Sequence, residues 1–227
     1  MNNVWAMDIE TVRDLRQAWV LPEPTIPGNY KKQETIDQYR AEAREKQLAQ
    51  MALSPLTGRV FCVVFVNSQS EVISFCCKDE TMCDEATVLR RSLQFLRQRQ
   101  LNGELIVTYN GTTFDFPYLF KRCAICNVRQ SQTDATITLD QFTERYENPY
   151  HLDLYRVWCG ANGKSGSESL DTLIRAVLGV DRAMTVDTKQ THELIQTSAG
   201  RSALLGKCQE DATYTKQLYE RFYGILF

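Results

Sequence analysis

Short apolar runs bounded by polar turns recur along the first two thirds of the chain. Residues 3–8 form one such run, which ends in an acid, and residues 59–66 and 71–76 are rich in β-branched and aromatic side chains. A polar tetrapeptide separates the latter two, as in a β-hairpin. Residues 104–109 and 151–157 are two further runs of strand type. The pattern predicts five strands, of which the second and third form a hairpin.

Segments with a helical period lie between and after these strands. Residues 84–100 carry aliphatic side chains on one stripe and acids near the beginning, where the helix dipole favours them. A second helix is predicted to begin near Asp115, since the proline that follows is tolerated only in a first helical turn. Residues 170–177 carry another apolar stripe, and the chain is predicted to be helical from about Thr191.

One long stretch does not fit the alternation of strands and helices. Residues 21–28 hold three of the six prolines, and residues 31–53 are rich in helix formers with opposite charges four positions apart. The composition predicts an exposed insertion at about residues 13–50, ending in a mostly solvated helix. We expect it to interrupt a single domain that spans residues 1–227, a length that buries one substantial core.

The order of elements indicates the fold class. Three strands come first and are predicted to pair antiparallel, and two more then alternate with helices, as parallel strands do. We therefore predict an α/β fold with a mixed five-stranded sheet, three strands antiparallel plus two parallel, flanked by helices.

Composition narrows the cellular setting and the class of protein. No apolar run approaches the roughly 18 residues of a membrane span, and the first residues lack a secretory leader, so we expect a soluble, intracellular protein of the cytoplasm with no membrane partner. Eight cysteines scattered through a chain of this size are expected to be reduced thiols. The formal net charge of −2 argues against a protein that holds nucleic acid by broad electrostatic attraction, because such proteins usually carry an excess of basic residues. It does not exclude a nuclease, because carboxylates that bind metal ions also make the formal net charge more negative.

A pair of acids stands at the end of the first predicted strand. Asp8 and Glu10 are two positions apart, so their carboxylates point to the same face of a strand. Two adjacent anions at the end of an apolar strand need a cation. The alternative is an acidic pair that simply reaches solvent at the end of the strand.

Two further acids occupy positions of interest on helices. Asp115 stands at a predicted helix start, where an ordinary N-cap role is an alternative to catalysis. Asp211 lies seven residues from both Leu204 and Leu218, on the apolar stripe of the last helix. A charge on a buried face is usually hydrogen-bonded, paired with a cation or bound to a metal. The nearest cation on the same face is Lys207.

Three segments, in this order along the chain, resemble the exonuclease motifs of the DEDD superfamily, which has a ribonuclease-H-like fold. They are MDIET on the first strand, YNGTTFDFPYL after the fourth, and KCQEDATYTKQLY near the end. The chain is most similar to the proofreading exonuclease domain of family B DNA polymerases and its stand-alone relatives, which share an ALSP segment followed by a glycine and a valine, here from Ala52 to Val60. The resemblance covers most of the chain outside residues 13–50.

The resemblance implies a 3′–5′ exonuclease with two bound metal ions. Carried over position by position, the metal-ligating acids fall on Asp8, Glu10, Asp115 and Asp211. Hard carboxylate oxygens select Mg²⁺ or Mn²⁺, and two such ions activate a water and stabilise the leaving 3′ oxygen.

The resemblance also implies a substrate and the residues that contact it. Thr11, Asn110 and Phe114 correspond to positions that hold the terminal nucleotide, and the implied partner is single-stranded or frayed nucleic acid, with DNA favoured by the resemblance alone. An aromatic ring at such a site stacks on an unpaired base. The alternative for Phe114 is packing beneath its helix.

The sequence departs from the family at one catalytic position. Relatives carry a tyrosine four residues before the last aspartate, or a histidine five before it, and here Lys207 and Gly206 stand there. A lysine can stabilise phosphate charge or orient the attacking water, or it can be an ordinary i,i+4 ion pair with Asp211. Two hypotheses follow: an active exonuclease in which Lys207 belongs to the catalytic set, or a catalytically weak or inactive module that binds nucleic acid or a partner protein.

Overall fold

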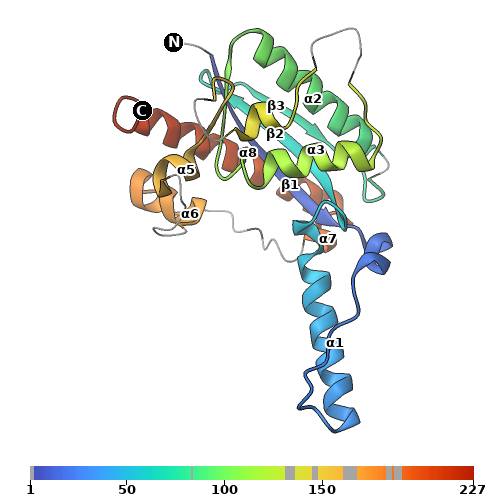
Figure 1. The fold of residues 1–227 in the computed structure, drawn as a ribbon. Helices are drawn as coiled ribbons and strands as arrows, with labels where there is room; N and C mark the ends of the chain where they lie inside the picture. The colour runs from blue at the N-terminus through green and yellow to red at the C-terminus, as the bar shows by residue number, and fades with distance from the viewer. Residues whose placement is uncertain are drawn as a thin grey trace.

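The protein is built around one five-stranded sheet (Figure 1). The structure, a computed structural model, describes residues 3–82, 84–130, 136–144, 148–160, 168–182, 186 and 191–227. The strands lie in the order β3-β2-β1-β4-β5. Their bounds are β1 Val4–Arg13, β2 Gly58–Asn67, β3 Val72–Cys76, β4 Leu105–Thr108 and β5 His151–Asp153.

Strand directions agree with the predicted fold class. β1 pairs antiparallel with β2, and β2 pairs antiparallel with β3, whereas β4 runs parallel to both β1 and β5. The predicted mixed sheet of three antiparallel and two parallel strands is confirmed. β1 therefore lies in the middle of the sheet, and its residues are buried along nearly all of its length.

Helices cover both faces of the sheet (Figure 1). α2, Glu85–Leu101, and α3, Asp115–Ile125, lie on one face, and the 25-residue α8, Ser198–Phe222, lies on the other, where it packs on β1 and β2. Shorter elements connect them: α4 Asp140–Thr143, α5 Leu154–Cys159, α6 Leu170–Leu173, the π-helix η3 Ile174–Leu178 and α7 Thr191–Leu194. Among the described residues, no helix combines the length and apolar character that crossing a membrane requires.

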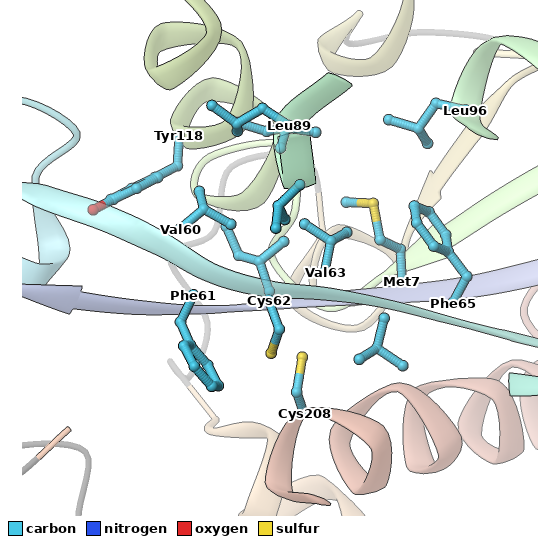
Figure 2. Packing of buried hydrophobic residues seen from close by; sticks show 14 of the residues in the cluster. Met7, Val60, Phe61, Cys62, Val63, Phe65, Leu89, Leu96, Tyr118 and Cys208 are labelled. Carbon is cyan, nitrogen blue, oxygen red and sulfur yellow. The ribbon is translucent and has the colours of Figure 1, made fainter. Parts of the chain in front are cut away.

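The core lies on both sides of β2 (Figure 2). Leu89 of α2 and Tyr118 of α3 lie on one side of this strand, and Cys208 of α8 lies on the other, facing Cys62. These side chains are at most 2% exposed. The seven cysteines within the described residues carry free thiols. Burial on both faces explains why β2 reads as a continuous apolar run rather than as an alternating one.

The predicted insertion contains its own elements, the 3₁₀-helix η1, Leu15–Val20, then α1, Gln33–Gln50, and the 3₁₀-turn η2, Met51–Leu53. α1 projects away from the sheet (Figure 1), and none of its residues is buried. This agrees with a polar helix stabilised by pairs such as Gln33 with Asp37, whose side chains are hydrogen-bonded at 2.9 Å. That residues 1–227 form one domain with this segment as an insertion stays a prediction.

One predicted strand is much shorter than its apolar pattern. The expected strand at residues 151–157 ends at Asp153, and helix α5 begins at Leu154. The carboxylate of Asp153 accepts the N–H of Tyr155 at 3.1 Å, which is the N-cap interaction that starts a helix. The second half of this prediction was wrong because an N-cap inside the apolar run outweighs the strand pattern.

Candidate metal and active site

Acids from the central strand and the last helix meet at one point. Asp8 and Glu10 lie on β1, and Asp211 lies on α8, which packs across that strand. One carboxylate oxygen from each of the three lies within 4.8 Å of the other two. Asp211 is 6% exposed, as its place on the apolar stripe predicted. Packing of α8 on β1 thus brings together acids that are about 200 positions apart in the sequence.

Asp115 approaches the same site from a third element. It is the first residue of α3, 4% exposed, and it lines a cavity of about 650 Å³ together with Asp8 and Glu10. It lies outside the tight group of three oxygens. The alternative of an N-cap role does not apply, because Phe114 occupies the N-cap position and Asp115 is the next residue.

The turn that leads into α3 is held by Asp153. Its carboxylate accepts the backbone N–H of Asn110 at 2.7 Å and that of Thr112 at 3.0 Å, besides the N–H of Tyr155 at 3.1 Å. Asn110 has a φ of +67°, in the left-handed region that asparagine tolerates better than most residues. A Cβ on Gly111 would lie 2.2 Å from the hydroxyl of Thr108, so only glycine fits there. Asp153 is therefore a positioning residue for the loop before Asp115.

Burial and mutual repulsion disfavour the ionised forms of the clustered acids. Burial, and then the charges of Asp211, Asp115 and Glu10, raise the pKa of Asp8 well above its usual value. Burial, followed by the charge of Asp153, raises the pKa of Asp115 to about 8. Oδ2 of Asp8 is buried and has no hydrogen-bond partner among the described residues. A divalent cation would satisfy this oxygen and relieve the repulsion among the carboxylates.

Two side-chain cations already contact this cluster. Nζ of Lys207 donates to Oε1 of Glu10 at 2.5 Å and to Oδ2 of Asp211 at 2.8 Å. Arg182 hydrogen-bonds to Asp211 and also to Glu210, the latter at 3.2 Å. Burial alone would lower the pKa of Lys207, but the charges of Glu10 and Asp211 outweigh it and raise the pKa, so the amine stays an ammonium.

The Lys207–Asp211 ion pair, one of the alternatives for Lys207, is present. The sequence did not indicate that Lys207 also contacts Glu10 or that Arg182 contacts Asp211. Lys207 also reaches Glu10 on another element, and Arg182 lies 29 positions before Asp211 on a loop without a helical or strand pattern. No local spacing relates these residues to one another. The signal in the sequence was the position of Asp211 on the apolar stripe of its helix, since a charge on a buried face needs a partner.

The predicted substrate residues also surround the cavity. Thr11, Asn110 and Phe114 all line it. The hydroxyl of Thr11 donates to the backbone carbonyl of Ala52 at 2.8 Å, which ties β1 to the end of the insertion. Phe114 is partly buried against the core, with its ring centroid 5.4 Å from that of Tyr118. Phe114 thus packs against the core and also lines the cavity, so both roles considered for its ring are compatible with its position.

Part of the lining of the cavity comes from the insertion, which the sequence did not assign to the site. Lys46, Ala49 and Gln50 of α1 line it, as do Ala52 and Leu53 of η2. No sequence motif identifies these residues as part of a site. A helix with few apolar positions is predicted to be exposed to solvent along its whole length. Their place follows from where η2 joins β1 and β2.

The donor set fits hard divalent cations. Asp8, Glu10 and Asp211 offer carboxylate oxygens alone within the tight group, and Asp115 adds a fourth carboxylate at the cavity. Oxygen-only sites suit Mg²⁺ or Mn²⁺ rather than softer metals. Oδ2 of Asp8, buried and without a hydrogen-bond partner among the described residues, is available as a ligand atom.

Comparison with solved structures supports the fold. The chain superposes on the family B DNA polymerase of the archaeon Pyrobaculum calidifontis with a TM-score of 0.64 and 18% identity, covering 98% of this chain and 24% of the polymerase. At this identity the likeness concerns the fold alone. It places the chain beside one part of a much longer enzyme.

Sequence comparison finds archaeal DNA polymerases. The chain is 25% identical over 150 residues to the DNA polymerase of Thermococcus hydrothermalis, which covers 63% of this chain and 9% of that protein. It is 24% identical over 150 residues to DNA polymerase 1 of Pyrococcus abyssi, covering 63% and 19%. The chain therefore spans less than a quarter of the length of these relatives.

A family profile matches most of the chain. It is described as a predicted 3′–5′ exonuclease related to the exonuclease domain of PolB, and it matches residues 53–225. Asp115, Lys207 and Asp211 fall inside the matched region, whereas Asp8 and Glu10 precede it. The chain belongs to this family of predicted 3′–5′ exonucleases related to the exonuclease domain of PolB.

Proposed function

We propose that this protein is a metal-dependent 3′–5′ exonuclease that hydrolyses phosphodiester bonds at single-stranded or frayed nucleic-acid ends. The observation that carries the proposal is the group formed by Asp8, Glu10 and Asp211, each with one carboxylate oxygen within 4.8 Å of the other two, in which Oδ2 of Asp8 is buried and lacks a hydrogen-bond partner among the described residues. DNA is the proposed substrate, because the relatives of this chain are named as DNA polymerases.

Four carboxylates would hold the metal ions: Asp8, Glu10, Asp211 and, from the start of α3, Asp115. Held there, two Mg²⁺ or Mn²⁺ ions would supply an activated water and would stabilise charge on the leaving 3′ oxygen. The chain itself orients these carboxylates through the buried strand β1 and the packed helix α8. Asp153 fixes the turn before α3, and Phe114 offers a ring at the cavity against which an unpaired base can stack.

Lys207 holds the acids together when no metal ion is bound. Its ammonium contacts Glu10 and Asp211, two of the proposed metal ligands, at 2.5 and 2.8 Å. An ammonium and a divalent cation that use the same oxygens compete for them. We therefore assign to Lys207 the role of an internal counter-ion that metal binding displaces.

The proposal predicts laddering of DNA from its 3′ end. A single-stranded oligodeoxynucleotide labelled at its 5′ end is expected to shorten one nucleotide at a time with Mn²⁺ or Mg²⁺, and not when both are removed by a chelator. Denaturing gel electrophoresis gives the product lengths. An oligoribonucleotide of the same sequence tests the DNA preference. Failure to shorten either oligonucleotide with any divalent ion would contradict the proposal.

Lys207→Tyr is expected to tighten Mn²⁺ binding by roughly tenfold, since it removes a positive charge from two ligand carboxylates. Turnover is expected to rise, because a tyrosine stands here in relatives. Isothermal titration calorimetry measures the Kd, and the gel assay measures turnover. Lys216→Met is the matched control, because Lys216 also lies on α8 in an i,i+4 pair, 3.4 Å from Glu220, but away from the acids. Tighter Mn²⁺ binding with lost turnover would assign a catalytic contact to Lys207.

A second candidate function is a non-catalytic module that binds nucleic acid or a partner protein. The neutralisation of Glu10 and Asp211 by Lys207 and Arg182 favours it, because a cluster satisfied by internal cations has less need of metal ions. This candidate predicts that single-stranded DNA binds without being shortened and that Mn²⁺ does not bind even to Lys207→Tyr.

A further inference from the structure

The helical insertion presents a defined face to the cavity that holds the acids. Lys46, Ala49, Gln50 and Leu53 line this cavity, and their spacing of three and four residues places them on one side of α1 and its continuation η2. We call these four residues the insertion wall.

Two other side chains of α1 attach the helix to the rest of the insertion. The guanidinium of Arg44 donates to the carbonyl of Ala18 at 2.8 Å, and the amide of Gln47 donates to that of Pro22 at 3.1 Å. Thr11 and Thr57 donate to carbonyls of Ala52 and Met51 at 2.8 and 3.0 Å, and so fix the end of the insertion to the sheet. These contacts set the rotation of α1, so that the insertion wall faces the cavity.

The insertion wall offers exposed side chains at the cavity. Lys46 and Gln50 are exposed, and within the described part of the chain the ammonium of Lys46 forms no ion pair. Leu53 is 65% exposed although it is large and apolar. A cation and an apolar side chain about two turns apart, lining the same cavity as the clustered acids, match the phosphate and the base of a nucleic-acid strand.

We propose that the insertion wall forms one side of a groove for single-stranded nucleic acid whose 3′ end lies at the acids. Lys46 pairs with a backbone phosphate, and Leu53 packs against an unpaired base. The inference rests on the proposed function and deepens it, since it gives the insertion the task of holding the strand rather than of assisting hydrolysis.

Strand binding can be measured apart from hydrolysis. The probe is a fluorescein-labelled single-stranded oligodeoxynucleotide with phosphorothioate linkages at its 3′ end, and fluorescence anisotropy gives its Kd. Lys46→Ala is expected to raise the Kd by roughly three- to tenfold and to lower the slope of log Kd against log salt by about 0.7, the value for one phosphate contact on a single strand. Lys46→Arg is expected to keep both near the wild-type values.

The control lies on the same helix. Lys32 is the exposed N-cap residue of α1, about 20 Å along the helix from Lys46, so Lys32→Ala is expected to leave the Kd unchanged. For Leu53, the matched probe carries abasic sites near its 3′ end. Leu53→Ala is expected to weaken binding of the normal oligonucleotide but not of the abasic one, because only the former has a base to contact.

Two results would overturn the inference, and they differ in what they say of the proposed function. If wild type shortens DNA but Lys46→Ala and Lys32→Ala have equal Kd values, the insertion wall does not bind the strand and the exonuclease assignment stands. If wild type neither binds nor shortens the oligonucleotide, both proposals fail together.

Discussion

Replacing Asp115 by alanine is expected to lower the rate of 3′ shortening by a factor on the order of 10³, the usual effect of losing one strong electrostatic contribution to a transition state. Asp115 supplies a buried carboxylate from a different element than the other three acids, so no neighbour can take its place. Burial raises its pKa to about 8, so at neutral pH its ionised form opposes folding, and the variant should therefore remain folded.

The matched control is Asp140→Ala. Asp140 is the first residue of α4, as Asp115 is of α3, but it is exposed and away from the cavity. It is expected to leave the rate unchanged. Circular dichroism checks that both variants are folded. Equal rates for the two variants, with fold retained, would show that Asp115 holds no catalytic metal ion.

The largest expected effect on stability concerns Glu85, at the beginning of α2. This residue is 2% exposed, and it accepts hydrogen bonds from Arg122 at 2.7 and 2.9 Å, from Arg59 at 3.1 Å and from the N–H of Val60 at 2.9 Å. Burial alone would raise its pKa, but the hydrogen bonds and charge of Arg122 outweigh burial and lower it. Glu85 thus connects α2, α3 and β2 through one buried carboxylate.

Glu85→Ala is expected to lower the free energy of unfolding by about 3–5 kcal/mol, because it leaves the buried guanidinium of Arg122 without its partner. Urea denaturation measures the change. Glu80→Ala is the control, since its pair with Arg201 is 3.4 Å long with a half-exposed carboxylate, and such surface pairs contribute under about 1 kcal/mol.

A double variant separates the ion pair from the packing. The double variant that combines Glu85→Met with Arg122→Met removes both buried charges. It is therefore expected to recover most of the free energy of unfolding that Glu85→Ala loses. If Glu85→Ala lowers the free energy of unfolding by no more than Glu80→Ala does, the buried carboxylate of Glu85 does not hold α2 and α3 together.

The sequence indicated the proposed metal ligands better than their surroundings. Asp8 and Glu10 share a strand face, and Asp211 interrupts an apolar stripe, so local periodicity alone marked them as unusual. Lys207 was marked because it stands where relatives carry a tyrosine. The second partner of Lys207, Glu10, and the contact of Arg182 with Asp211 carried no signal, because both join residues that no local spacing relates.

For the insertion, too, the sequence predicted the local structure but not the contacts with other elements. Its polar composition correctly predicted an exposed helix at α1, since local propensity and charge pairs determine such a helix. Composition could not indicate that Lys46 and Leu53 face the acids. That orientation depends on hydrogen bonds from Arg44 and Gln47 to carbonyls more than 20 residues away in the sequence.

By itself the sequence determined four of the five strands, the main helices and the mixed sheet, because the period of apolar residues defines each element and their order along the chain indicates how the strands pair. Only the tertiary structure decided that Lys207 bridges Glu10 and Asp211 and that the insertion lines the cavity. These features arise where separate elements meet. Their geometry is set by packing across the sheet, which no local pattern records.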